Sequence, residues 1–131
     1  MKLLLIAAAL VATPALAQKP AAAPAAPHPG AIVFQNVCQA CHMANAMGAE
    51  GAGRIAALAK NPALEAAEYP IQVVTGGKGA MPWFRGQLSD QQIADVITYV
   101  RSNYGNKYKD VVTVAMVQKY GIPAPKGGGR E

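Results

Sequence analysis

The stretch of sequence that decides the fold of this chain is Cys38-Gln39-Ala40-Cys41-His42. It holds both cysteines of the chain and one of its two histidines. If the stretch is helical, the two thiols lie about one turn apart on the same side of the helix, so both can reach one edge of a single flat group. The imidazole that follows then lies beneath the centre of that group, where it can bind a metal ion.

The Cys-x-x-Cys-His pattern indicates covalent attachment of one c-type haem, with thioether bonds from Cys38 and Cys41 and with His42 as an axial ligand of the iron. Three alternatives to haem attachment remain. A disulfide or thioredoxin-like site is expected after a hydrophobic strand in a βαβ pattern, whereas residues 31–37 have a helical pattern. A zinc site needs four ligands, and the only other histidine, His28, lies in a proline-rich segment. The third alternative is a chance match to the pattern.

The N-terminus predicts export from the cytoplasm. Met1-Lys2 supplies one positive charge, residues 3–12 are apolar, and Pro14 is followed by the small-residue site Ala15-Leu16-Ala17. This is the pattern of a secretory signal peptide, cleaved here after Ala17; an uncleaved anchor is the alternative. Because the apolar run is shorter than the roughly 20 residues of a spanning helix, we expect a periplasmic protein that does not span the membrane after cleavage.

The rest of the chain predicts one small domain between two loose segments. The signal peptide (1–17) is followed by an Ala/Pro-rich linker (18–30), whose composition is typical of an extended spacer. Residues 31–121 form the expected folded domain, which is small enough to need a bound group for stability. Residues 122–131, with three consecutive glycines, form an expected flexible tail.

A second iron ligand is predicted at Met81, within the segment 76–82, Gly-Gly-Lys-Gly-Ala-Met-Pro. Glycines allow a tight turn close to a flat ligand, and Pro82 disfavours helical geometry at Met81. His/Met ligation raises the reduction potential and suits electron transfer. The alternative is a methionine that fills a gap in the core. The other candidates are less well placed, because they follow His42 too closely, lie in a predicted helix or lie in the linker: Met43, Met47, Met116 and His28.

The folded part is expected to be all-α, with three to four short helices around the haem. The predicted helices run from about 31 into the haem motif and over about 67–75, 90–103 and 111–120. The clearest is 90–103, where Ser89 and Gln92 form a capping box, apolar residues recur at three- and four-residue steps, and Gly105 ends the helix. Val73-Val74 and Val111-Val112 favour strands, but these pairs are too short and isolated to build a sheet.

This arrangement closely resembles the class I cytochromes c over about residues 30–105. Gly30 and Phe34 match the small and aromatic residues before the first cysteine of that family, and Val96 and Tyr99 match the positions of the C-terminal helix against which they pack. Three segments also look like those of small monohaem cytochromes found with bacterial periplasmic dehydrogenases. They are Cys-His-Met-x-Asn at 41–45, Gly-Ala-Gly at 51–53 and Met-Pro-Trp-Phe at 81–84. The resemblance implies the class I cytochrome c fold.

The chain departs from the family at one position. A proline after the haem motif commonly supplies the carbonyl that accepts a hydrogen bond from the ligand histidine, but residues 54–58 contain no proline. Because the acceptor is a backbone carbonyl, we expect Ala56 to accept this bond from His42. Such a bond orients the imidazole ring and raises its basicity.

With His42 and Met81 both bound to the iron, no site remains for a substrate, so the expected function is electron transfer and not an enzymatic activity. The expected donor is a periplasmic dehydrogenase, and the expected acceptor is a respiratory oxidase or another cytochrome. The net charge of +5 is spread along the chain without a Lys/Arg run, which argues against nucleic acid as a partner. We expect cations around the haem edge to steer an acidic partner: Lys78, Arg85, Arg54 and Lys60.

Two other functions are considered. In the first, the chain is a fixed cytochrome subunit of a periplasmic dehydrogenase, which the linker and the extension after Gly105 favour. In the second, the haem iron is five-coordinate and binds gas or reduces peroxide. The second function predicts that Met81 is not a ligand and that ferrous iron binds carbon monoxide readily.

Overall fold

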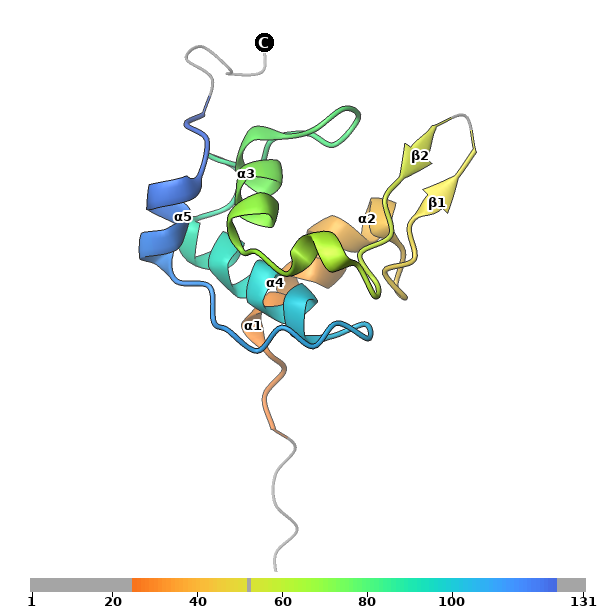
Figure 1. The fold of residues 1–131 in the computed structure, drawn as a ribbon, viewed down its shortest axis with the longest axis horizontal. Coiled ribbons are helices and arrows are strands. Elements are labelled where there is room, and N and C mark those ends of the chain that lie inside the picture. The colour runs from red at the N-terminus through yellow and green to blue at the C-terminus, as the bar shows by residue number, and fades with distance from the viewer. Residues whose placement is uncertain (1–24, 52, 125–131) are drawn as a thin grey trace, which may run out of the picture.

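The structure is a computed structural model that describes residues 25–51 and 53–124. The signal peptide with its cleavage site, most of the linker and the end of the tail lie outside these residues. The described part is mostly helical and has the class I cytochrome c fold, which confirms the predicted fold class (Figure 1). Its elements are α1 (Pro29–Val33), a π-helical turn (Phe34–Cys38), α2 (Gln39–His42), β1 (Ala49–Glu50), β2 (Arg54–Ile55), a 3₁₀ turn (Pro62–Leu64), α3 (Glu68–Gly76), α4 (Asp90–Ser102) and α5 (Val114–Tyr120).

The first helical run extends from α1 through the π-helical turn into α2. It begins at Pro29, earlier than predicted, because His28 Nδ1 accepts a hydrogen bond from the Gly30 amide at 3.0 Å and proline is favoured at the first helical position. It ends at Met43, whose φ of 67° cannot continue a right-handed helix. The motif therefore lies at the C-terminal end of a helical run that is anchored at its start.

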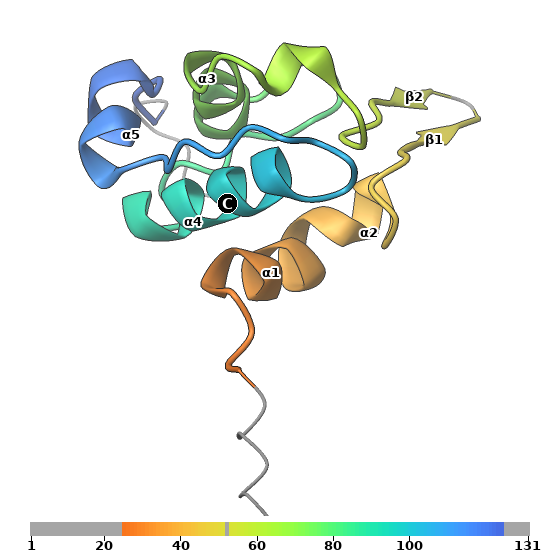
Figure 2. The ribbon, with the colours of Figure 1, turned by 60° about the horizontal axis from the view of Figure 1, so that its bottom comes forward.

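The crossing of α1 and α4 forms the centre of the core (Figure 2). A Cβ at Gly30 would collide with the backbone carbonyl of Asp95 in α4, so only glycine allows the two helices to approach this closely. Phe34 is fully buried, and its ring lies 6.2 Å from that of Tyr99 and 5.0 Å from that of Tyr104. The packing of Gly30 and Phe34 against the later helix, inferred from the family resemblance, is confirmed.

The helix α4 has the predicted start and ends one residue before the predicted Asn103. The Ser89 hydroxyl accepts from the Gln92 amide, and the Gln92 side chain accepts from the Ser89 amide, which completes the capping box. The helix ends at Ser102, and both Tyr104 (φ 54°) and Gly105 (φ 80°) are left-handed. The chain leaves the helix before Gly105 because the Asn103 side chain donates to the Tyr99 carbonyl at 2.8 Å. This hydrogen bond satisfies a free carbonyl in the last turn of the helix.

The helices α3 and α5 pack on one another and on α4. Thr113 caps α5 by accepting from the Met116 amide, and Val117 buries its side chain completely. The predicted helix over 111–120 is therefore shorter than expected. Neither valine pair forms a strand, because Val73 and Val74 lie within α3 and the Val112 amide donates instead to the hydroxyl of Thr98 in α4 at 2.9 Å.

A short β-hairpin after the haem motif was not predicted. In the antiparallel pair β1–β2, Ala49 faces Ile55 and Glu50 faces Arg54. Gly48, with φ of 69°, precedes it, and a Cβ there would collide with the carbonyl of Ile55. The sequence lacks the alternating pattern of a strand here, so the close approach at Gly48 and not strand propensity forms the hairpin. The hairpin and α5 lie at opposite ends of the molecule (Figures 1 and 2).

Within residues 25–51 and 53–124, every helix is too short or too polar to cross a bilayer.

Candidate haem site

The π-helical turn positions the two cysteines of the motif. Its wider winding, with the Gln39 amide donating to the Phe34 carbonyl, turns Phe34 into the core and leaves Cys38 half-buried and Cys41 exposed. Such turns are rare in proteins and are frequent at functional sites. Both thiols are free in the structure, and the motif follows a helical run and not the strand of a thioredoxin-like site.

The electrostatics of Cys38 also argue against a thioredoxin-like site. Burial, and then the charge of the nearby Cys41, raise the pKa of Cys38 to about 11. A redox-active thiol needs a depressed pKa, because the thiolate is the attacking species. The zinc alternative finds no ligand set either, since no three side chains of the metal-binding types come together in the described part of the chain.

His42 is held in the orientation that a metal ligand requires. The residue is 8% exposed, and its Nδ1–H donates to the carbonyl oxygen of Ala56 at 2.9 Å. Since a carbonyl only accepts, Nδ1 carries a proton, and Nε2 is the ring nitrogen left to bind a metal ion. The predicted bond to Ala56, in place of the proline carbonyl of the family, is confirmed.

The loop that carries Ala56 is closed on itself. The Ala46 carbonyl accepts hydrogen bonds from the amides of Leu58 and Ala59, at 2.8 and 3.0 Å, and the Gly48 amide donates to the His42 carbonyl at 3.1 Å. Ala46 is buried with a φ of 58°, a conformation that costs free energy for a non-glycine residue and persists only where its surroundings enforce it. The loop therefore holds the Ala56 carbonyl in place without a proline.

Met81 lies half-buried in the loop between α3 and α4, as the sequence predicted. Gly77 has a φ of 75°, and a Cβ there would lie 2.8 Å from the Met81 carbonyl oxygen. The backbones of Lys78 and Met81 exchange two hydrogen bonds of 3.0 Å, which closes a tight turn. This loop extends from α3 towards the end of the molecule where α2 and the hairpin lie (Figures 1 and 2).

The chemistry of these residues fits a haem. A helical Cys-x-x-Cys-His turn provides two thiols and an oriented imidazole, and Met81 provides a soft thioether that suits haem iron. No hydrogen bond joins the Met81 loop to the motif among the described residues, so the two parts remain separate elements of the site. Large apolar side chains near the motif and in the Met81 loop remain about 40–60% exposed, as expected of residues that a bound haem covers: Met43, Met47 and Trp83.

The predicted cations have different environments. Arg54 is exposed and forms a surface ion pair with Glu50, with 3.6 Å between Nε and Oε1. The Lys78 ammonium donates to the Tyr69 hydroxyl at 3.0 Å. Lys60 lays its aliphatic stem over Gly105. The expectation that Arg85 is a surface docking residue is wrong, because its side chain is only 18% exposed and forms an ion pair of 3.0 Å with Asp90.

The role of Arg85 was missed in the sequence, although a local signal existed. Asp90 follows Arg85 by five residues and lies in the first turn of α4, where an acidic residue is favoured by the helix dipole. Arg85 also donates to the backbone carbonyls of Val117 in α5 and of Ile122 just after it. Nothing in the local sequence around Arg85 identifies these two partners.

Comparisons with known proteins agree with this site. The family model described as cytochrome c oxidase, cbb3-type, subunit III matches residues 25–100. A cytochrome c6 from Leptolyngbya boryana is 45% identical over 78 residues, which cover 54% of this chain and 85% of that protein. The cytochrome c subunit of a quinone alcohol dehydrogenase from Gluconacetobacter polyoxogenes is 34% identical over 117 residues, which cover 76% of this chain and 24% of that protein.

The chain thus spans most of the cytochrome c6 and about a quarter of the dehydrogenase subunit. The family match covers more than half of the chain and includes the Cys-x-x-Cys-His motif and Met81. The chain therefore belongs to the c-type cytochrome family described as cytochrome c oxidase, cbb3-type, subunit III, with a covalently bound haem c and a role in electron transfer.

Proposed function

We propose that this protein is a periplasmic one-electron carrier and not an enzyme. Cys38 and Cys41 would hold the haem through thioether bonds, and His42 and Met81 would be the two ligands of its iron. The haem, when bound, supplies an iron that takes one electron as it goes from ferric to ferrous and releases it on return. The donor in this proposal is a periplasmic dehydrogenase, and the acceptor is a respiratory oxidase or another cytochrome.

The observation that carries this proposal is the hydrogen bond from His42 Nδ1 to the Ala56 carbonyl. It fixes the imidazole tautomer and directs the basic Nε2 away from the loop, as metal-binding histidines require. The buried position of His42 excludes an ordinary surface histidine. Because the loop around Ala56 is closed by its own hydrogen bonds, the carbonyl that orients the ring is held in place.

The Met81 loop occupies the second axial position in this proposal. Its tight turn presents the thioether from an extended backbone segment before Pro82. With His42 and Met81 both bound to it, the iron would have no site left for a substrate. Lys78 and Arg54 remain the candidate cations for steering an acidic partner.

Optical spectra of the purified holoprotein test this proposal. We expect a methionine–ferric charge-transfer band in the oxidised protein and no reaction of the reduced protein with carbon monoxide. A high-spin ferric spectrum with rapid carbon monoxide binding would contradict Met81 ligation and favour the five-coordinate, gas- or peroxide-binding function. Absence of haem after expression with a working maturation system would contradict attachment at Cys38 and Cys41.

A second placement, as a fixed subunit of a dehydrogenase, keeps the same haem chemistry. It is favoured by the 34% identity to a dehydrogenase cytochrome c subunit over 117 residues and by the ordered segment after Gly105, which includes α5. Purification of the tagged protein from its own membranes and periplasm separates the two placements. A stoichiometric dehydrogenase in the purified sample supports the subunit, and a monomeric cytochrome alone supports the free carrier.

The proposed division of the chain is a signal peptide (1–17), a linker (18–30), a cytochrome domain (31–121) and a tail (122–131). N-terminal sequencing of the exported protein tests its first boundary, with Gln18 as the expected first residue. A mature chain that still begins at Met1 would contradict signal cleavage and favour a membrane anchor.

A further inference from the structure

We propose that the C-terminal segment from α5 to Ile122 is a brace that holds the Met81 loop closed, with Arg85 as the positioning residue. This inference rests on the proposed function, because it assigns the loop the task of keeping Met81 on the iron. The segment lies outside the 25–100 range that matches the family model. The brace is the name used below for residues 114–122.

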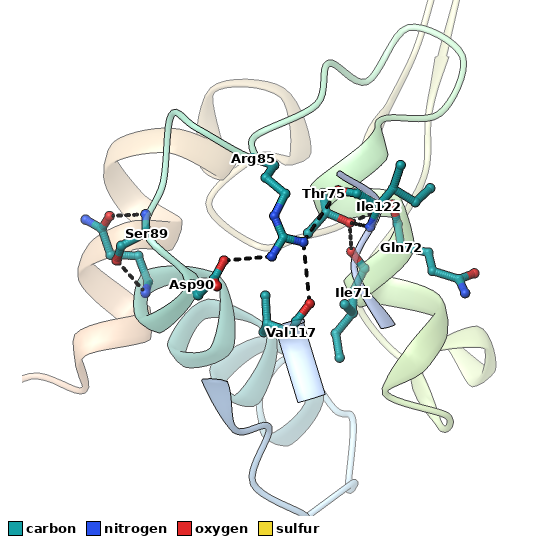
Figure 3. Close-up of polar contacts among 9 residues, drawn as sticks. Ile71, Gln72, Thr75, Arg85, Ser89, Asp90, Val117 and Ile122 are labelled. Atoms are coloured by element: carbon teal, nitrogen blue, oxygen red, sulfur yellow. Dashed lines mark hydrogen bonds and ion pairs between the residues drawn. The ribbon is translucent and has the colours of Figure 1, made fainter. Parts of the chain in front are cut away.

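Arg85 joins the end of the Met81 loop to two helices. Its Nη2 pairs with the Asp90 carboxylate at 3.0 Å, at the start of α4 (Figure 3). Its Nη1 points to two backbone carbonyls of the brace, Val117 at 3.5 Å and Ile122 at 3.4 Å. Because the guanidinium is planar and has five donors, one side chain serves all three acceptors. The 18% and 28% exposure of Arg85 and Asp90 limits how far solvent screens the pair.

Thr75 makes the second connection, between the brace and α3. The Thr75 hydroxyl is buried, donates to the Ile71 carbonyl at 2.6 Å and accepts from the Ile122 amide at 2.9 Å (Figure 3). Thr75 lies in the last turn of α3, immediately before the glycines that begin the Met81 loop. The brace therefore binds both the start and the end of the loop.

Two glycines allow the brace to lie directly on these groups. A Cβ at Gly76 would collide with the side chain of Ile122, and a Cβ at Gly121 would collide with the guanidinium of Arg85 and the carbonyl of Val117. Gly121 has a φ of −71°, which any residue adopts. Glycine is required there for close packing and not for backbone conformation.

The anchored positions leave only a short free span around Met81. The Gly77 amide donates to the Val73 carbonyl at 2.8 Å, and the Phe84 amide donates to the Val74 carbonyl at 2.9 Å. Arg85 follows Phe84 directly, so its contacts with Asp90 and the brace hold the backbone that makes the Phe84 bond. When the loop opens to release Met81, the Phe84 bond and the neighbouring Arg85 contacts must break together.

The test compares the ferric holoprotein with three variants: Arg85→Gln, Arg85→Lys and Thr75→Val. Lys109→Gln is the control, since Lys109 is exposed and its loss removes the same charge as Arg85→Gln. The first measurement is the rate of imidazole binding, because imidazole reaches the iron only after Met81 leaves it. The second is hydrogen exchange at the Phe84 amide, which reports loop opening whether or not Met81 is the ligand.

We expect Arg85→Gln to raise the imidazole-binding rate about tenfold, as for loss of a charge-assisted hydrogen bond, and to speed exchange at Phe84 similarly. Arg85→Lys restores the pair with Asp90 but not the fork to the two carbonyls, so its rates lie between those of the unchanged chain and Arg85→Gln. Thr75→Val speeds both processes, because the Ile122 amide loses its acceptor. Lys109→Gln changes neither rate.

Unchanged rates in Arg85→Gln and Thr75→Val would overturn the brace. So would equal acceleration of exchange in α4, because that result shows general destabilisation and no specific hold on the loop. If Arg85→Gln fails to fold, Thr75→Val decides the question alone. If the unchanged protein has no methionine–iron band, Met81 ligation fails, while exchange at Phe84 still decides whether the brace holds the loop.

Discussion

At the scale of single residues, the proposed site depends on how each ligand is held. His42 is oriented by one hydrogen bond to the backbone of a closed loop, and Met81 by a tight turn between anchored positions. The two ligands differ in rigidity, because His42 is the last residue of α2, whereas Met81 lies in a loop that must stay closed to keep its bond. We therefore expect Met81, and not His42, to be the first ligand to leave the iron when the protein is destabilised by heat or denaturant.

Replacement of the proposed ligand tests its role directly. Met81→Ala should remove the methionine–ferric band and allow carbon monoxide to bind. The reduction potential should fall by on the order of 100 mV, since axial ligands set haem potentials over about 0.8 V. Spectroscopic redox titration measures the change. The control is Val111→Ala, which shortens an exposed apolar side chain outside the proposed site and should leave potential and spectrum unchanged. Equal effects of the two variants would contradict Met81 ligation.

At the scale of elements, the crossing of α1 and α4 fixes the position of the haem motif. The helical run that begins at Pro29 carries the motif at its other end, so any shift at the crossing displaces both cysteines and His42. Close approach at Gly30 permits the aromatic packing of Phe34, Tyr99 and Tyr104. These rings stabilise the crossing beyond the burial of their area, through tilted and edge-to-face contacts.

Addition of a single methyl group at this crossing should destabilise the protein strongly. Gly30→Ala places a Cβ against the Asp95 carbonyl and within 2.7 Å of the Tyr99 Cβ. We expect a loss of about 3 kcal/mol in the free energy of unfolding, although alanine favours helix by about 1 kcal/mol over glycine. Denaturant titration measures the loss. In the control Gly53→Ala, the new Cβ meets nothing within 4 Å, and a comparable loss there would contradict the steric argument.

At the scale of the whole molecule, one buried side chain joins segments that are far apart in the sequence. Arg101 is 2% exposed and donates to the carbonyls of Leu64, Glu65 and Asp110, each at 2.8–2.9 Å. It links α4 to the 3₁₀ turn before α3 and to the segment before α5. Neutral carbonyls therefore satisfy the donors of a buried cation, so removal of the guanidinium leaves several acceptors unpaired at once.

We expect Arg101→Lys to lower the free energy of unfolding by roughly 3 kcal/mol despite the retained charge, because an ammonium cannot reach three acceptors in the geometry of the fork. Denaturant titration followed by haem absorbance measures the change. The exposed substitution Lys109→Gln should stay within about 0.5 kcal/mol of the unchanged protein. A loss of under 1 kcal/mol in Arg101→Lys would show that water replaces the missing donors.

Local patterns account for the parts of the fold that were predicted correctly. The capping box at Ser89 and the apolar face of α4 both depend on residues within a few turns of each other. The hairpin β1–β2 and the partners of Arg85 were not predicted. Each depends on contacts that only the folded chain makes, such as the approach of Gly48 to Ile55.

The sequence alone determined the haem motif and the turn that presents Met81, because covalent attachment, ligand spacing and Gly/Pro backbone preferences are properties of neighbouring residues. Only the tertiary structure decided what Arg85 does and where the segment after Gly105 lies. The carbonyls of Val117 and Ile122 are separated from Arg85 by more than thirty residues. Every other backbone carbonyl could accept from an arginine equally well, so the sequence does not single these two out. Packing of α5 on α3 and α4 selects these acceptors, because burial of Val117 fixes the position of α5 and of the segment that follows it.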